Sequence, residues 1–219
     1  MMQVLSVNVG QPREVQWRGE TLRTSIWKDP VAGRVRVTKQ NVEGDRQSDP
    51  SVHGAPDMTV YAYPSEHYAF WRDQLPGMEL PWGAFGENLS VQGLFENTVR
   101  IGDRLRIGST ELVVTQPRLP CFKLGIRFGR KDIVKRFQQS GRTGFYLSVL
   151  QEGDIGVGDA IEHLAASEDS LTVSDIVSLV DGAENRDLMR RAAALQALPA
   201  SWRQHFQKTL KENRGQSPI

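Results

Sequence analysis

The sequence contains little cysteine: Cys121 is the only one in 219 residues. A single thiol cannot form an intramolecular disulfide, so a disulfide-stabilised extracellular scaffold is excluded. No apolar run approaches the roughly 20 residues that a membrane-spanning helix needs, which excludes a helical membrane protein. The N-terminus also lacks a basic segment followed by an apolar core. We therefore expect no signal peptide and a cytoplasmic location.

The motifs of a resident electron carrier are missing as well. The sequence shows no flavin motif and no haem pattern, and one cysteine is too few for an iron–sulfur cluster. It also lacks the basic domain, aromatic stacking positions or known motif of a nucleic-acid-binding protein. We therefore expect no nucleic-acid partner, and any redox reaction must draw its electrons from outside the chain.

The charge is unevenly distributed, although the net charge is only +1. Between residues 116 and 147 there are eight basic residues, and Asp132 is the only acidic one. Such a patch favours a bound anion or an acidic partner surface. Its cations at 131, 135 and 136 fit a solvated helix face, whereas Arg118 and Arg142 flank turns near the cysteine.

Short strands are predicted over most of the first 165 residues. Apolar and polar residues alternate at 5–9, 35–37 and 59–63, each bounded by turn-forming residues. Residues 104–107 and 111–115 are typical of a hairpin, and its second strand leads into the cysteine segment. Helices are expected within 64–75, with Pro64 in the first turn, and over 132–139. The pattern predicts a mainly β, α+β domain with a barrel-like sheet.

The remaining residues predict three short helices. Thr172 and Asp175 match a capping box, Asn185 is a second helix cap, and Pro199 precedes a third apolar stripe. We therefore divide the chain into a β domain, residues 1–165, and a helical region, residues 166–219. About 50 residues make too small a core to stand alone, so the helices are expected to pack on the β domain or on a second subunit.

Cys121 is the leading candidate for the chemistry. It lies between Pro117-Arg118-Leu119-Pro120 and Phe122-Lys123, just beyond a predicted strand. A thiolate is a nucleophile and a soft-metal ligand, and nearby cations lower a thiol's pKa. A lone cysteine is otherwise a small buried hydrophobic residue. The prolines and cations around Cys121 favour the chemical role.

Two other polar segments are candidates for ligand binding. His53 and Gly54 lie in a long polar loop between residues 44 and 57, where the histidine either contacts an anion or substrate or fixes the loop itself. Asn88 follows the glycines of Gly83-Ala84-Phe85-Gly86, and either belongs to a plain turn or offers its amide to a heterocyclic ligand.

Taken in order, these segments resemble the MOSC domain, and specifically its YiiM type. The resemblance rests on the His53-Gly54 loop with Val60–Pro64, on Gly86-Glu87-Asn88-Leu89, on Gln116–Cys121, on Gly141-Arg142-Thr143-Gly144-Phe145-Tyr146 and on Gly158-Asp159. No single motif decides it, but their ordered combination is specific and extends over essentially the whole chain, the helical region included.

The resemblance implies a molybdenum cofactor of the molybdopterin type, with Cys121 as both the metal ligand and the catalytic residue. It implies a reductase of N-hydroxylated compounds such as 6-hydroxylaminopurine, supplied with electrons by an external reductase of the flavoprotein class. The cofactor-binding residues it indicates are Lys28, His53, Gly54, Asn88, Arg118, Arg142 and Gly144. Lys28 matches a family lysine near the cofactor phosphate.

The chain departs from the family pattern at two loop positions, and two other functions remain open. Ala55 and Arg46 stand where relatives usually have glycine, and both resist a positive φ. The sequence therefore does not determine the backbone conformation of the loop at these two positions. One alternative is a sulfur-transfer enzyme or carrier with a persulfide on Cys121. The other is a non-enzymatic module that binds or delivers the molybdenum cofactor.

Overall fold

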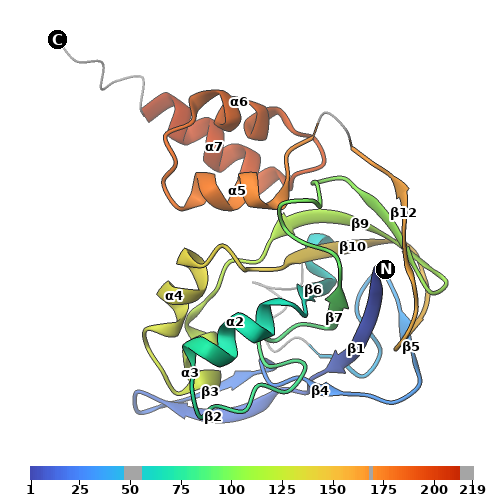
Figure 1. The fold of residues 1–219 in the computed structure, drawn as a ribbon. Helices are drawn as coiled ribbons and strands as arrows, with labels where there is room; N and C mark the ends of the chain where they lie inside the picture. Colours follow the sequence, from blue (N-terminus) through green and yellow to red (C-terminus); the bar gives the residue numbers. More distant parts are fainter. Residues whose placement is uncertain (47–55, 168–169, 213–219) are drawn as a thin grey trace.

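A curved eight-stranded sheet forms the centre of the molecule (Figure 1). The computed structural model describes residues 1–46, 56–167 and 170–212. All neighbouring strands of the sheet pair antiparallel except β6 and β7, which run parallel. In spatial order the strands are β12 (Ile161–Ala165), β8 (Arg104–Ile107), β9 (Thr110–Pro117), β10 (Phe145–Gln151), β6 (Val60–Pro64), β7 (Leu89–Gln92), β1 (Gln3–Val9) and β4 (Asp29–Pro30).

The sheet curls back on itself next to its first strand. The amide of Val4 donates to Asp159 O at 3.0 Å, and Gly158 returns a bond to Val4 O at 2.9 Å. Ile161, the first residue of β12, donates to Met2 O at 2.9 Å. These bonds join β1 to the segment that leads into β12, so this side of the sheet closes on itself as in a barrel. The predicted mainly β, barrel-like α+β fold is confirmed.

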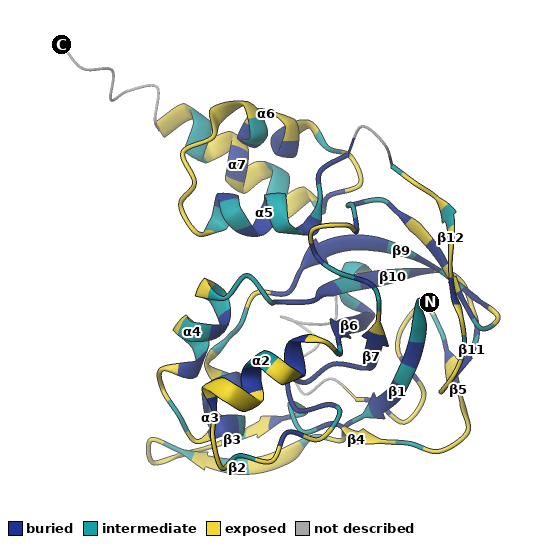
Figure 2. Ribbon diagram, in the orientation of Figure 1, coloured by how far each residue is buried: buried dark blue, intermediate teal, exposed yellow. Residues whose placement is uncertain are grey.

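Two small ribbons complete the β structure. β5 (Arg34–Val37) pairs with β11 (Gly153–Gly156), and β2 (Arg13–Trp17) pairs with β3 (Glu20–Thr24). The sequence analysis did not predict the β2–β3 hairpin. It is mostly exposed, as Figure 2 shows, so it carries little of the apolar alternation that identifies a strand. The hairpin delivers the chain into residues 25–28.

A second core, rich in aromatic side chains, is formed largely by α2 (His67–Gln74), α3 (Phe122–Phe128) and α4 (Ile133–Gln139). These helices lie to the left of β6 and β7 in Figure 1. Trp71 and Phe137 stack at 5.6 Å between ring centroids, and Trp71 Nε1 donates to Tyr63 Oη at 2.7 Å. The placement of Pro64 in the first turn of α2 was wrong. Pro64 ends β6, where it pairs with Val91 of β7, and the helix begins at His67.

The three C-terminal helices share the main hydrophobic core with the sheet. They are α5 (Val173–Val180), α6 (Arg186–Ala194) and α7 (Ala200–Glu212). Asp175 N donates to Thr172 Oγ1 at 3.0 Å and Thr172 N donates to Asp175 Oδ2 at 2.9 Å, so the predicted capping box is present. Ile176 and Phe206 are almost fully buried, and each such side chain stabilises the fold by about 1.5–3 kcal/mol. The helices pack on the β domain, as one of the two predicted arrangements required.

No helix in the described ranges is long and apolar enough to cross a membrane.

Candidate functional site

A pocket opens beside Cys121, where β9 ends and α3 begins. It encloses ≈ 650 Å³ of empty space, part of it open to solvent. Four residues predicted from the sequence line it together: Lys28, Asn88, Arg118 and Cys121. The other lining residues are Thr24, Ser25, Ile26, Asp45, Arg46, Met58, Tyr61, Gly86, Lys123 and Tyr146. The lining thus carries four cationic side chains against one carboxylate, which favours an anionic ligand.

One wall of the pocket is the segment that follows the β2–β3 hairpin. It packs closely on the Gly83–Gly86 turn, because a Cβ on Gly83 would lie 2.5 Å from Lys28 O. Gly83 also has a φ of +83°, a conformation that other residues adopt at a cost. The glycine is therefore needed both for the turn and for the approach of the wall.

The Gly83–Asn88 turn is also held by a carboxylate in its interior. Glu87 is fully buried and accepts from Gly83 N at 2.9 Å, from Phe85 N at 3.1 Å and from the hydroxyl groups of Ser90 and Tyr68. Burial raises the pKa of Glu87, while these hydrogen bonds act in the opposite direction. The side chain organises the turn and does not line the pocket.

Lys28 and Asp45 form a buried ion pair in the pocket. Lys28 Nζ lies 2.5 Å from both carboxylate oxygens, and the carboxylate also accepts from Gly10 N at 2.7 Å and from Asn88 Nδ2 at 2.9 Å. Burial lowers the pKa of Lys28, because loss of water outweighs the attraction of Asp45. The ammonium already has one counter-ion before any ligand binds.

Asn88 has its side-chain amide committed to the protein. Besides the bond to Asp45, its Oδ1 accepts from Tyr61 N at 3.1 Å. The amide thus ties Asp45 to strand β6 and shapes the wall of the pocket. A direct contact between Asn88 and a heterocyclic ligand stays a prediction.

Arg118 and Ser25 bring unsatisfied polar atoms into the pocket. The Arg118 guanidinium lies 5.2 Å from the ring centroid of Tyr61 and 5.3 Å from that of Phe137, with the residue only 4% exposed. Arg118 Nη1 and Ser25 Oγ are buried and have no hydrogen-bond partner among the described residues. A buried polar atom without a partner costs about 1–3 kcal/mol. Both atoms therefore favour a ligand that accepts hydrogen bonds.

Cys121 occupies the residue just before α3. Its φ of −120° and ψ of 173° are extended, and its side chain makes no capping bond to the helix. It is a free, partly buried thiol that lines the same pocket as Arg118. The sequence analysis placed the cysteine at a strand end but did not predict the seven-residue helix after it. The sulfur is available to a ligand rather than used by the fold.

Arg142 and Gly144, which were also predicted, are not among the described residues that line this pocket. The Arg142 guanidinium lies 4.1 Å from the ring centroid of Phe70, and its Nη1 donates to Ser140 O at 3.2 Å. Gly144 is buried between β6 and the Arg118 backbone, whose amide donates to Gly144 O at 3.2 Å. Their contact with a cofactor stays a prediction, and His53 and Gly54 lie outside the described residues.

The loop positions where the chain departs from its family give one clear result. Arg46 lines the pocket without adopting a positive φ, so no glycine is needed there. Ala55 lies outside the described residues.

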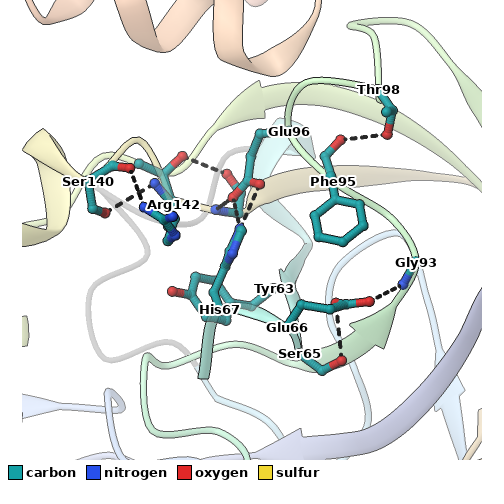
Figure 3. Close-up of polar contacts among 12 residues, drawn as sticks. Tyr63, Ser65, Glu66, His67, Gly93, Phe95, Glu96, Thr98, Ser140 and Arg142 are labelled. Carbon is teal, nitrogen blue, oxygen red and sulfur yellow. Dashed lines mark hydrogen bonds and ion pairs between the residues drawn. The ribbon is translucent and has the colours of Figure 1, made fainter. Parts of the chain in front are cut away.

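Glu96, a buried carboxylate that was not predicted from the sequence, holds the turn at Thr143 and Gly144 next to the pocket residues Arg118 and Tyr61. Figure 3 shows Glu96 with its partner His67. Glu96 accepts from Gly144 N at 2.7 Å and contacts His67 Nε2 at 2.8 Å. The turn it holds accepts a bond from Arg118 N at Gly144 and one from Tyr61 Oη at Thr143 O, 2.7 Å away. Glu96 thus positions two pocket residues without touching the pocket. No sequence motif marks it, because its partners are distant in the chain.

Comparison with known proteins assigns the two parts of the chain. Residues 49–162 match the MOSC domain, and residues 180–212 match the YiiM-like, 3-alpha helix domain. The Bacillus subtilis protein YflK is 42% identical over 207 residues, which cover 94% of this chain and 93% of that protein. A protein of Gibberella moniliformis named "Reductase" is 35% identical over 164 residues, which are 74% of this chain but only 29% of that protein.

The solved structures agree with these matches. The crystal structure of YiiM from Geobacillus stearothermophilus superposes with a TM-score of 0.81 at 36% identity, covering 96% of this chain and all of that one. Both the β domain and the helices are included in a superposition of that extent. The chain therefore belongs to the MOSC domain family, in the branch that carries the YiiM-like three-helix domain.

Proposed function

We propose that this protein is a molybdenum-cofactor-dependent reductase of N-hydroxylated compounds such as 6-hydroxylaminopurine, acting in the detoxification of N-hydroxylated base analogues. Membership of the MOSC family supports the cofactor class, and the fungal relative named as a reductase supports the reaction class. The observation that carries the proposal is the pocket itself. It combines a free thiol, an excess of cations and two unsatisfied buried polar atoms.

The lining residues fit a cofactor that carries its own metal ligands. No group of three histidine, cysteine or carboxylate side chains that could hold a metal ion occurs in the described ranges. A metal in this pocket would therefore take one soft ligand, the Cys121 thiolate, and its remaining ligands from the cofactor. When bound, the molybdenum cofactor supplies the two-electron chemistry that removes oxygen from the substrate.

The other pocket residues bind and orient the anionic part of the cofactor. Arg118 presents an unsatisfied N–H, and charge-assisted bonds from a guanidinium to phosphate are among the strongest in proteins. Ser25 offers a second unsatisfied polar atom, and Lys28 adds a positive charge that Asp45 keeps in place. The rings of Tyr61 and Tyr146, 5.3 Å apart, restrict the space beside Arg118.

An external donor supplies the electrons for the overall reaction. The N–O bond of the substrate breaks, and R–NHOH with two electrons and two protons becomes R–NH2 and water. The electrons come from a separate reductase, which we take to be a flavoprotein, because the chain has no carrier motif of its own.

The first experiment measures metal and pterin in protein expressed with an intact cofactor pathway, followed by reduction of 6-hydroxylaminopurine with reduced methyl viologen. We expect one molybdenum and one pterin per chain, and we expect Cys121→Ser to fold normally and lose turnover, because a hydroxyl is a poor soft-metal donor. Lys135→Ala is the matched control, since Lys135 is an exposed residue of α4 outside the pocket.

Each alternative gives its own result. A sulfur carrier would contain no metal or pterin, and its intact mass would rise by one sulfur atom on Cys121. A delivery module would hold the cofactor but reduce no N-hydroxylated compound with any donor. An active Cys121→Ser enzyme would contradict the role of the thiolate.

A further inference from the structure

Two exposed apolar residues flank the pocket residue Cys121 in the sequence. Leu119 is 43% exposed and Phe122 is 53% exposed, although both belong to the short segment that presents the sulfur. Single exposed apolar residues are ordinary, but exposed apolar residues gathered beside a reactive group mark an interaction site. Neither side chain belongs to a hydrophobic core, so neither contributes to core packing.

The pocket lining and helix α3 also carry cations that have no acidic partner. The Arg127 guanidinium lies 5.7 Å from the ring centroid of Trp27, in the wall segment of the pocket. Arg127, Lys123 and Arg46 form no ion pair with any described residue, and the last two line the pocket. The neighbouring carboxylates are already engaged, because Asp45 binds Lys28 and Asp29 binds Arg13 at 2.7 Å. Arg46, Lys123 and Arg127 therefore keep uncompensated positive charges.

We propose that Leu119, Phe122 and Arg127, here called the mouth patch, are the docking surface for an acidic flavoprotein that delivers electrons to the pocket. The inference rests on the proposed function, which requires two electrons from outside the chain. A flavin hydroquinone in the partner loses those two electrons and becomes oxidised flavin, while R–NHOH takes them up with two protons to form R–NH2 and water.

The composition of the patch, two apolar residues and one cation, fits a short-lived electron-transfer complex. Electron-transfer partners form small, short-lived interfaces at the low end of the range, below about 1,200 Å² of total buried surface. Such interfaces combine a few apolar or aromatic anchors with charges that steer the encounter. Phe122, the residue after Cys121, provides the aromatic anchor, and Arg127 of the same short helix provides the steering charge.

The test compares two electron donors in the molybdenum-loaded enzyme. Reduced methyl viologen is a small dye that needs no docking surface. Flavodoxin, an acidic FMN protein, must dock, and its hydroquinone then gives up the two electrons of one turnover in two successive one-electron steps. We expect Phe122→Ser and Leu119→Ser to lower kcat/KM for flavodoxin about tenfold and to leave the dye-driven rate unchanged. Arg127→Glu should lower the flavodoxin rate most at low ionic strength and flatten its salt dependence.

Matched controls come from the far side of the molecule. Leu150 is also 43% exposed, at the end of β10 opposite to the pocket residue Tyr146, and Lys211 is an exposed residue of α7. Leu150→Ser and Lys211→Glu should leave both donor reactions within about twofold, because surface changes away from a contact have small effects.

The outcomes separate this proposal from the one on which it rests. If neither donor supports turnover of cofactor-loaded wild-type protein, the proposed reductase function fails. If the dye supports turnover but flavodoxin does not, or if the mouth-patch variants lose both reactions equally, the docking proposal is overturned. Loss of binding to anionic lipid vesicles in Phe122→Ser, with unchanged flavodoxin kinetics, would also overturn it and assign the patch to a membrane surface.

Discussion

Gly144 offers a sharp test of how the pocket is held together. A Cβ at this position would lie 2.4 Å from Ala62 O, 2.8 Å from Tyr61 Cε2 and 2.9 Å from Tyr63 Cδ2. The backbone φ is +65°, so any other residue is strained as well. Gly144→Ala therefore perturbs the protein in two ways, by backbone strain and by steric overlap with β6.

A second glycine separates these two effects. Gly141 has the same φ of +65°, yet a Cβ there would meet nothing within 4 Å. Adopting a left-handed conformation costs a non-glycine residue about 1–2 kcal/mol. The loss of unfolded-state entropy returns about 0.4–1 kcal/mol. We therefore expect Gly141→Ala to lower the free energy of unfolding by about 1 kcal/mol or less.

Gly144→Ala adds the steric cost to the same strain. Over-packing in a buried site costs about 1–3 kcal/mol, so the total loss should be about 1–4 kcal/mol. The overlap also pushes on Tyr61, and it loosens the turn that binds Glu96 and Arg118. Cofactor occupancy should therefore fall in Gly144→Ala and stay near normal in Gly141→Ala.

Urea unfolding of both variants, with molybdenum and pterin content measured in parallel, checks these values. The difference between the two midpoints, multiplied by a common m-value, gives the steric contribution directly. Equal losses of stability, within about 0.5 kcal/mol, would show that β6 relaxes around the added methyl group and would refute the reasoning.

Three further predictions follow from the ion pair, the buried guanidinium and the helices. Asp45→Asn should destabilise the protein by about 3–5 kcal/mol at pH 7, because it leaves a buried ammonium without its counter-ion. Burial already lowers the pKa of Lys28, and loss of Asp45 should lower it further. The variant should therefore regain stability as the pH rises from the pKa of Lys28 in the folded state towards its pKa in the unfolded state. Urea titrations that show the same loss of stability at pH 7 and pH 10 would contradict this. Arg118→Gln should lower pterin occupancy, whereas Arg136→Gln, in α4 and outside the pocket, should not; equal occupancy in the two variants would count against a phosphate role. Truncation after Ala165 should lower solubility and melting temperature, because the helices share the main core; an equally stable truncated protein that has lost all cofactor would instead place the helices in the site.

The sequence by itself determined the elements whose residues depend on near neighbours. Alternation of apolar and polar residues predicted β1, β5 and β6, but it did not predict β7 or β10. Spacing of three and four predicted the apolar faces of the C-terminal helices. Thr172 and Asn185 were correctly predicted as caps, because a capping bond joins residues only two or three positions apart. The position of Cys121 among prolines and cations also made it the leading candidate, and the structure places it in the lining of the pocket.

The sequence did not reveal elements with weak local patterns. The β2–β3 hairpin is exposed on most of its positions, so alternation could not identify it. Helix α3 is short and has Gly125 in its interior, a residue that weakens the local preference for a helix. Pro64 was misplaced because a proline suits either a helix start or the end of a strand, and only the pairing of β6 with β7 decided between them.

Only the tertiary structure decided which candidates meet in one pocket. Lys28, Asn88, Arg118 and Cys121 are separated by long stretches of chain, and no local rule specifies which of them share a cavity. The fold brought these four together and set Arg142 apart, over the ring of Phe70. It also supplied Asp45 and Glu96, whose carboxylates act on residues 17 and 48 positions away. Such contacts depend on how the sheet curves and on which water is excluded, and these are properties of the packed chain rather than of any segment of its sequence.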